Sequence, residues 1–301
     1  MITWKETIEN YKAFLTLERG MSANTVVAYT YDIKKLFHFC EQEKPPVPPR
    51  EVTYPLLNRY LAGLPGARVS ARTQARNVSS LKSFFKFLVI DGTLAVNPAE
   101  KLETPKGPKT LPNVLSVDEI EAMIRVTGND YNGQRDRAVL ETLYSCGLRV
   151  SELTNLKTSN VNFRVGYVKV HGKGNKERLV PLGTRAKEEI RSYQKARDSV
   201  LGGRNEDILF LSRDGKKLSR VSIFNIIKKL SLKAGINKII SPHTLRHSFA
   251  SHLVNGGADI RVVQDMLGHA SILTSEIYTH LDSAFLLDMM ISHHPRAKKK
   301  K

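Results

Sequence analysis

Apolar residues in the first ninety positions recur at steps of three and four, the spacing that places them on one face of a helix. A helix that starts near Trp4 is followed by one for which Ser22 is a suitable N-cap. This second helix must end before Pro45, because proline lacks a backbone donor. A short helix around residues 56–61 and a long one at about 69–90 complete the pattern. The first part of the chain therefore predicts a helical bundle.

The helical pattern stops between residues 97 and 113, where four prolines alternate with lysines and no period is present. Such a stretch is typical of a linker. We therefore expect two domains, at residues 1–105 and 116–301, joined by a linker at residues 106–115.

The second domain again begins with a helix, since Ser116 and Glu119 have the spacing of a capping box. A further helix ends at Gly147. Between residues 167 and 181 the apolar period shortens to two, which predicts a hairpin with its turn at Gly174-Asn175. Helices are expected again near residues 186, 223, 244, 259 and 272 and after residue 282. The predicted fold class is mainly α, a helical bundle followed by a mixed, mostly helical domain with a small antiparallel β-sheet.

The charge of the chain is strongly positive: 47 Lys and Arg stand against 29 Asp and Glu, a net charge of +18. Residues 1–110 hold 16 basic and 10 acidic groups, and residues 111–301 hold 31 and 19, so the excess runs through both halves. A polyanion, most simply nucleic acid, is the partner that this charge favours. The alternative is an ordinary soluble basic protein.

Composition excludes several other classes. Hydrophobic residues make up 41% and charged residues 25%, which is typical of a globular chain. No run approaches 18 apolar residues and the N-terminus lacks the apolar segment of a signal peptide, so we expect a cytoplasmic protein with no membrane span. Cys40 and Cys146 lie in apolar helical patterns, which predicts buried thiols in a reducing compartment. The sequence has no P-loop, HExxH or paired CxxC motif, so we expect neither ATP nor a metal or other cofactor.

Several chemically capable side chains lie at helix and turn boundaries. Arg149 closely follows the helix-ending Gly147, and Glu152 lies three residues further on, where its carboxylate can orient the guanidinium. A planar guanidinium can bind two phosphate oxygens at once. Lys173 lies between two glycines of the predicted turn, where the backbone allows close approach to a ligand. The alternatives are a surface ion pair and a solvated turn lysine.

A second group of candidates lies on one predicted helix. Arg246 borders its apolar stripe, three residues after His243. An arginine at the edge of a core needs an anion or a carboxylate beside it, and His243 is placed to share that anion. His252 falls within the stripe and is interpreted as a core histidine, whereas His247 is expected to be exposed.

A third group follows Gly268, which is expected to end a helix. His269 lies in the turn, and Tyr278 lies on the next predicted helix. A lone tyrosine on a helix most often packs against a core. Nine residues after a turn histidine, in a chain with the other groups, Tyr278 is a candidate nucleophile.

Further cations gather near the fourth helix and the linker. Arg68, Arg72 and Arg76 mark the polar half of a helix whose second half is apolar, so one end can pack while the other meets DNA phosphates. Lys106 and Lys109 of the linker would suit a strap against a duplex. The alternative is a solvated helix end.

Taken together, these segments resemble the tyrosine recombinase (phage integrase) family. The resemblance rests on Gly147-Leu148-Arg149-Val150-Ser151-Glu152-Leu153, Lys173 in its glycine turn, His243-Thr244-Leu245-Arg246-His247, Leu267-Gly268-His269-Ala270-Ser271 and Tyr278-Thr279-His280. It extends over the N-terminal helices and Asn97-Pro98, and the compact length is most similar to the Xer branch. Val150 replaces the usual isoleucine, a conservative departure.

The resemblance implies a SAM-like DNA-binding domain followed by a catalytic domain. It implies a site-specific recombinase that cuts and rejoins DNA through a 3′-phosphotyrosyl intermediate, with Tyr278 as the nucleophile. Arg149 and Arg246 would hold the nonbridging oxygens of the scissile phosphate. Such a reaction requires no metal and no ATP.

The remaining roles follow from the same resemblance. Lys173 would protonate the leaving 5′-oxygen, and His243 would assist proton transfer at the tyrosine hydroxyl. His269 would donate to a phosphate oxygen, and Glu152 would orient Arg149.

The resemblance also implies partners. They are double-stranded DNA with a dif-like recombination site, like subunits in a homo- or hetero-tetramer, and a DNA translocase as a further candidate. The apolar helix after Tyr278 would dock into a neighbouring subunit. The implied biological role is the resolution of chromosome dimers during segregation. Alternatives are a type IB topoisomerase-like enzyme, a mobile-element integrase and an inactive sequence-specific DNA-binding protein.

Overall fold

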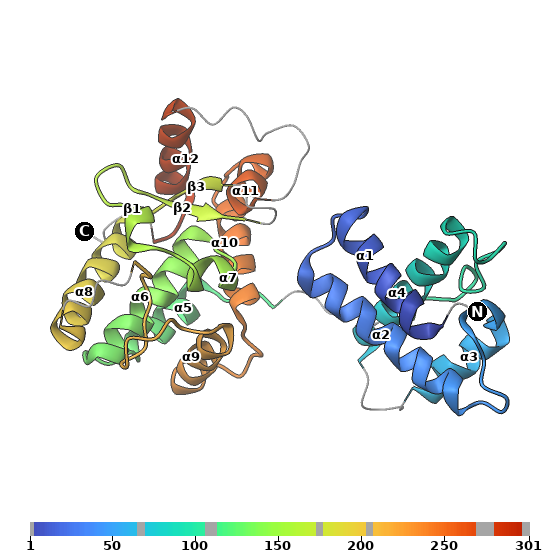
Figure 1. Cartoon of the computed structure of the whole chain (residues 1–301). Coiled ribbons are helices and arrows are strands. Elements are labelled where there is room, and N and C mark those ends of the chain that lie inside the picture. The colour runs from blue at the N-terminus through green and yellow to red at the C-terminus, as the bar shows by residue number, and fades with distance from the viewer. Residues whose placement is uncertain are drawn as a thin grey trace. The chain divides into compact units, whose positions relative to one another are not determined.

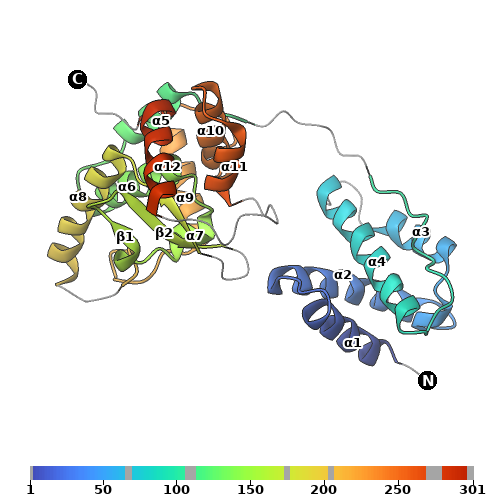
Figure 2. The same ribbon diagram turned by 90° about the horizontal axis from the view of Figure 1, so that it is seen from above.

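A computed structural model describes residues 3–64, 70–105, 113–172, 177–202, 207–268 and 280–296, with side chains from residue 285 onward in the last segment. The chain divides into two compact units, residues 1–110 and 111–301. Helices dominate both units (Figure 1 and Figure 2). The predicted fold class is confirmed.

The N-terminal unit is a helical bundle, as predicted. Its described elements are α1 (Trp4–Leu17), α2 (Ala23–Gln42), the 3-10 turn η1 (Pro49–Glu51), α3 (Tyr54–Gly63) and α4 (Ala71–Ile90). The hydroxyls of Ser22 and Ser70 cap α2 and α4. Helices α1, α2 and α4 pack against one another around an aromatic core, in which the Trp4 ring stacks on Phe84 at a centroid distance of 6.0 Å.

The C-terminal unit is a mostly helical domain. Its described elements are α5 (Val117–Arg125), α6 (Tyr131–Cys146), α7 (Val150–Thr154), η2 (Thr158–Asn160), β1 (Val161–Asn162), β2 (Tyr167–His171), β3 (Glu177–Pro181), α8 (Thr184–Leu201), α9 (Arg220–Lys233), α10 (Pro242–Asn255), α11 (Ile260–Leu267) and α12 (His280–His293). Helix α6 is the centre of this unit: it packs on α8 and α10 and is buried along most of its length. The capping box of Ser116 and Glu119 at the start of α5 is confirmed.

A small antiparallel sheet of order β1-β2-β3 lies in this unit. The hairpin strands β2 and β3 were predicted, and the residues expected at its turn, Gly174-Asn175, lie outside the described residues. Strand β1 has only two residues, too few for a period of two to be visible in the sequence. Val168 pairs with Val180, and both are buried, so this face of the sheet packs on the core.

The C-terminal helix α12 packs on its own unit, alongside β3 and α10 (Figure 1). Leu286 and Met290 are buried in the hydrophobic core of this unit. The inward face of this apolar helix is therefore covered by its own unit. Phe285 is 54% exposed and Ile291 is also exposed, so these two apolar side chains of the helix are not covered by its own unit. Docking of the helix into a neighbouring subunit stays a prediction.

Both cysteines are free and buried, as predicted, and burial raises the pKa of each thiol to about 12. Within the described ranges, no helix is long and apolar enough to cross a membrane.

Candidate active site

Arg149 is placed by a sharp turn between α6 and α7. Gly147 ends α6 in the left-handed conformation with φ of +55°, and a β-carbon at this position would lie 2.4 Å from the Phe249 ring. Arg149 then caps α7: its backbone N–H donates to Glu152 Oε2 at 2.8 Å, and its Nη1 donates to Glu152 Oε1 at 2.9 Å. The contact predicted between these two side chains is present.

Glu152 is shared with a second arginine. Arg178, on β3, donates from Nη1 to Glu152 Oε1 at 2.7 Å and from Nη2 to Oε2 at 2.9 Å. Burial alone would raise the pKa of the Glu152 carboxyl. The hydrogen bonds and charges of Arg178 and Arg149 outweigh that effect and hold the pKa below its ordinary value. Glu152 is therefore a charged carboxylate that bridges α7 and the sheet.

Arg178 is a site residue that the sequence analysis missed. It lies opposite Val170 in the β2–β3 pair, and directly opposed residues in antiparallel strands share a face. That face holds the buried Val168 and Val180, so the period of two puts an arginine in an apolar row. A charged residue in an apolar row of a strand is the sequence signal that could have identified Arg178, because a buried cation needs a carboxylate partner.

Arg246 enters the site from α10. The apolar stripe of α10 is buried as predicted, and Arg246 beside it is 8% exposed. Its Nη1 donates to the carbonyl of Gly147 at 2.6 Å and its Nη2 donates to the carbonyl of Leu267 at 2.5 Å. These two neutral carbonyls are the hydrogen-bond partners of its guanidinium among the described residues, and the anion expected beside it stays a prediction. Burial lowers the pKa of Arg246 to about 10, and the nearby charge of Arg149 acts in the same direction.

The end of α11 gathers all three arginines. Gly268 ends this helix in the left-handed conformation, with φ of +64°. The carbonyls of three successive residues accept from three different arginines: Met266 from Arg178 at 3.1 Å, Leu267 from Arg246 at 2.5 Å, and Gly268 from Arg149 at 2.9 Å. The last carbonyls of a helix lack partners within it and carry partial negative charge, so cations are favoured there.

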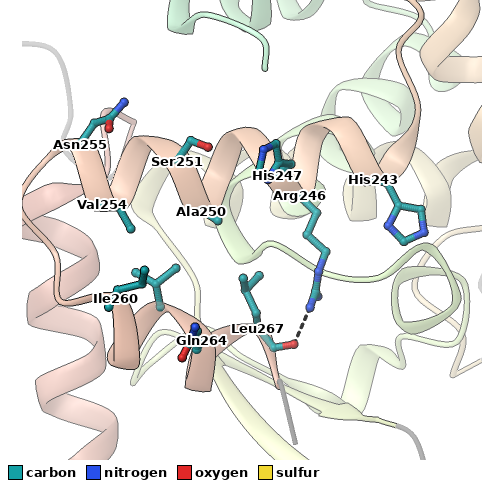
Figure 3. A pocket seen from close by; sticks show the side chains of 11 residues that line it. His243, Arg246, His247, Ala250, Ser251, Val254, Asn255, Ile260, Gln264 and Leu267 are labelled. Carbon is teal, nitrogen blue, oxygen red and sulfur yellow. Dashed lines mark hydrogen bonds between the residues drawn. The ribbon is translucent and has the colours of Figure 1, made fainter. Parts of the chain in front are cut away.

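A cavity of about 480 Å³ opens beside this cluster, between α10 and α11 (Figure 3). Arg246 reaches from α10 across the cavity toward Leu267, and His243 lies one turn earlier at its edge (Figure 3). His243 is exposed. His247 is exposed as predicted and also borders this cavity.

His252 is more polar in its surroundings than the sequence indicated. It is half-buried, and one ring nitrogen, Nδ1, lies 2.7 Å from the Tyr144 hydroxyl. Burial lowers the pKa of its imidazole. The contact ties α10 to α6, so this histidine supports the domain and does not face the cavity residues.

The predicted DNA contacts of the N-terminal unit separate into two kinds. Arg72, in the first turn of α4, is exposed. Arg76, one turn later, is paired with the buried Asp32 of α2, and Arg76 Nη2 donates to Asp32 Oδ1 at 3.1 Å. Arg76 therefore joins α4 to α2, a structural contact that the sequence did not indicate.

Six of the predicted site residues lie outside the described residues: Arg68, Lys106, Lys109, Lys173, His269 and Tyr278. Of the predicted catalytic set, the structure thus describes Arg149, Glu152, His243 and Arg246, and it brings Arg149, Glu152 and Arg246 to the end of α11.

The chemistry of this cluster is that of an anion site. Three guanidinium groups surround one carboxylate, which leaves an excess of two positive charges. A guanidinium has five N–H groups, and Arg149 and Arg246 each use two in the side-chain contacts above. The others can bind the oxygens of a phosphodiester. No three His, Cys, Asp or Glu side chains in the described part of the chain are grouped to hold a metal ion.

The arginine cluster, in a chain with a net charge of +18, favours a protein that acts on nucleic acid. Residues 113–284 match the model of the phage integrase family, and residues 8–92 match the phage integrase N-terminal SAM-like domain. The chain belongs to this family. It is a tyrosine recombinase, which cleaves and rejoins DNA through a tyrosine nucleophile.

Similarity to known recombinases extends over almost the whole chain. The tyrosine recombinase XerD of Oceanobacillus iheyensis is 42% identical over 292 residues, which span 96% of this chain and 98% of that protein. The crystal structure of XerA recombinase is 33% identical with a TM-score of 0.50, covering 97% of this chain and 99% of that one. XerH recombinase bound to its palindromic difH substrate is 19% identical with a TM-score of 0.71, covering 97% and 85%, a likeness that shows the fold.

Proposed function

We propose that this recombinase acts at a dif-like site in chromosomal DNA and resolves chromosome dimers during segregation, with Tyr278 as its nucleophile. The similarity to XerD over nearly the whole chain supports the Xer role. The observation that carries the catalytic assignment is the convergence of Arg149 and Arg246 on the end of α11, beside the cavity that His243 borders.

In the proposed reaction the Tyr278 oxygen attacks the scissile phosphorus, and His243 assists removal of the hydroxyl proton. A phosphotyrosyl bond forms at the 3′ side while the bond to the 5′-oxygen breaks, and Lys173 protonates that oxygen. Arg149 and Arg246 hold the nonbridging oxygens and offset the charge that develops in the transition state.

Glu152 and His269 complete the proposed site, the first by orienting Arg149 and the second by donating to a phosphate oxygen. Because the phosphotyrosyl bond retains the energy of the broken bond, a 5′-hydroxyl from another strand can reverse the step. Side chains supply the positive charge, so the proposed reaction uses neither metal nor ATP.

The proposed assembly is a homo- or hetero-tetramer of like subunits on DNA, in the cytoplasm, with a DNA translocase as a candidate activator. The exposed Phe285 and Ile291 of α12 are available for contact between subunits. Arg68, Arg72, Lys106 and Lys109 are the proposed contacts to the DNA backbone, together with the exposed part of Arg76.

The test is covalent capture. The protein is mixed with a nicked suicide duplex that carries candidate dif-like sites, in EDTA and without ATP, and adducts that survive SDS are counted. We expect an adduct with the native protein and none with Tyr278→Phe, since only the nucleophilic oxygen is removed. Tyr54→Phe changes an exposed tyrosine of α3 in the same way and should retain the adduct. An adduct that persists in Tyr278→Phe would disprove the nucleophile assignment.

Strand exchange then tests the biological role. Two duplexes with matching sites should yield recombinant products. Relaxation of a supercoiled plasmid without exchange would indicate the topoisomerase-like alternative. Exchange only at sites of a mobile element would indicate an integrase.

A further inference from the structure

Arg178 has no role in the reaction proposed above, yet it lies at the centre of the site. Its side chain is 12% exposed, and the Glu152 side chain that it contacts is 2% exposed. Both Glu152 oxygens accept from Arg178, and Arg178 Nε donates to the carbonyl of Met266 at 3.1 Å. One side chain therefore joins β3, α7 and the end of α11.

The charge balance of the site depends on this residue. Arg149, Arg178 and Glu152 together carry one net positive charge. Without Arg178, Glu152 would have Arg149 as its sole charged partner among the described residues, and this pair would be neutral. Arg149 would then be drawn into a closed ion pair in a poorly solvated place, where such attraction is strong. Arg178 thus leaves the charge of Arg149 available to an anion.

The shape of the site depends on it too. A β-carbon on Gly268 would lie 3.2 Å from the Arg178 side chain, which shows how closely the end of α11 rests on that guanidinium. In the same turn, the carbonyl of Leu267 accepts from Arg246 and the carbonyl of Gly268 accepts from Arg149. A shift of the turn would move both.

We propose that Arg178 is a positioning residue for DNA cleavage: it occupies Glu152 and anchors the end of α11, so that the charge of Arg149 stays available to the phosphate and its guanidinium stays correctly placed there. This inference rests on the proposed contact of Arg149 with the scissile phosphate.

The experiment compares single-turnover adduct formation, at saturating protein on the suicide duplex, for Arg178→Gln, Glu152→Gln and the double variant. Arg178→Gln is expected to slow cleavage about 10- to 100-fold, with DNA affinity changed less than about threefold. The double variant is expected to be faster than Arg178→Gln, because the neutral glutamine no longer pairs with Arg149. A structural role alone predicts losses in the free energy of unfolding only, with the same cleavage rate for the folded fraction of all three variants, so urea unfolding is measured beside the rates.

A matched control is Arg197→Gln. Arg197 is a buried arginine of α8 that donates to the carbonyls of Ile208 and Leu209, away from the site. Its loss should lower the unfolding midpoint and leave the cleavage rate of the folded protein unchanged.

Arg178→Lys keeps the charge but cannot span both oxygens and the Met266 carbonyl. It should cleave at a rate between those of the native protein and Arg178→Gln, and it provides the comparison if the glutamine variant does not fold. Equal losses for lysine and glutamine, a double variant slower than Arg178→Gln, or native cleavage by Arg178→Gln would each overturn the inference. Absence of any adduct with the native protein would instead count against the proposed function.

Discussion

At the scale of single residues, Glu152 shows how a buried charge is made tolerable. Its two oxygens accept from Arg149, from Arg178 and from the backbone N–H of Arg149. A buried carboxylate with fewer partners would be costly, and removing one partner of such a set is usually worse than removing the carboxylate itself. The free energies of unfolding of the Arg178 and Glu152 variants should follow this asymmetry, separately from their cleavage rates.

Two glycines that end helices allow a matched test of packing at the site. Gly147 and Gly202 both adopt the left-handed conformation, with φ of +55° and +60°. A β-carbon on Gly202 would have nothing within 4 Å, whereas one on Gly147 would lie 2.4 Å from the buried Phe249 ring. Gly202→Ala should cost about 1 kcal/mol from the backbone alone. Gly147→Ala should cost about 3 kcal/mol, because overpacking adds to that strain. Urea unfolding measures both, and equal losses would contradict the argument.

At the scale of elements, α4 combines two functions along its length. Its apolar half packs into the core through residues such as Phe84 and Phe85. Its N-terminal half carries Arg72, which is exposed, and Arg76, which pairs with Asp32. Burial raises the pKa of the Asp32 carboxyl, while the hydrogen bond from Ser80 and the charge of Arg76 act against that rise.

Substitution of these two arginines should separate binding from stability. Arg72→Gln should reduce the slope of log affinity against log salt by about 1 and change the unfolding free energy by less than about 0.5 kcal/mol. Arg76→Gln should lower the unfolding free energy by about 1–3 kcal/mol, because Asp32 is left buried without its cation. Salt-dependent DNA binding and urea unfolding are the two measurements. Equal effects of both variants on stability would disprove the distinction.

The sequence predicts local relations between elements better than distant ones. Arg149 and Glu152 are three residues apart and next to a glycine turn, so their contact follows from helix geometry. The carbonyls that hold Arg246 belong to residues 99 and 21 positions away, and no local pattern indicates them. Arg178 meets Glu152 only because β3 and α7 are brought together in the folded domain. The short β1 is missed for another reason, since two residues carry no period.

At the scale of the whole molecule, the segment that follows α12 packs back onto α5 and α6 of the catalytic unit. His294 is buried against Tyr144, with ring centroids 4.7 Å apart, and Arg296 pairs with Glu121 at 3.0 Å and with Glu141. Burial lowers the pKa of His294 to about 3. The packing of residues 294–296 thus includes a histidine that is neutral in the folded state.

This buried histidine should make the folded protein sensitive to acid. Below pH about 6.5 the unfolded chain binds a proton at this position, whereas the folded chain does not until pH about 3. Stability is therefore present above pH 6.5 and falls as the pH drops, by up to about 1.4 kcal/mol per pH unit for one such group. His294→Phe should reduce the slope of unfolding free energy between pH 6.5 and 4.5, where Glu152 is still ionised. His38→Phe, at an exposed position, should leave the slope unchanged, and identical slopes for all three proteins would rule the explanation out.

The arginines at the end of α11 are fastened largely to the main chain, at the carbonyls of Gly147, Met266, Leu267 and Gly268. A codon change alters a side chain and leaves a carbonyl oxygen where it was, provided that the backbone keeps its path. A point mutation at Gly147 or Leu267 therefore does not by itself remove the carbonyl oxygen to which Arg246 donates. Glu152 is the one described acceptor for these arginines that a single nucleotide change can delete. Substitutions around the site can thus exchange the surrounding side chains while the three arginines keep their backbone partners at the end of α11.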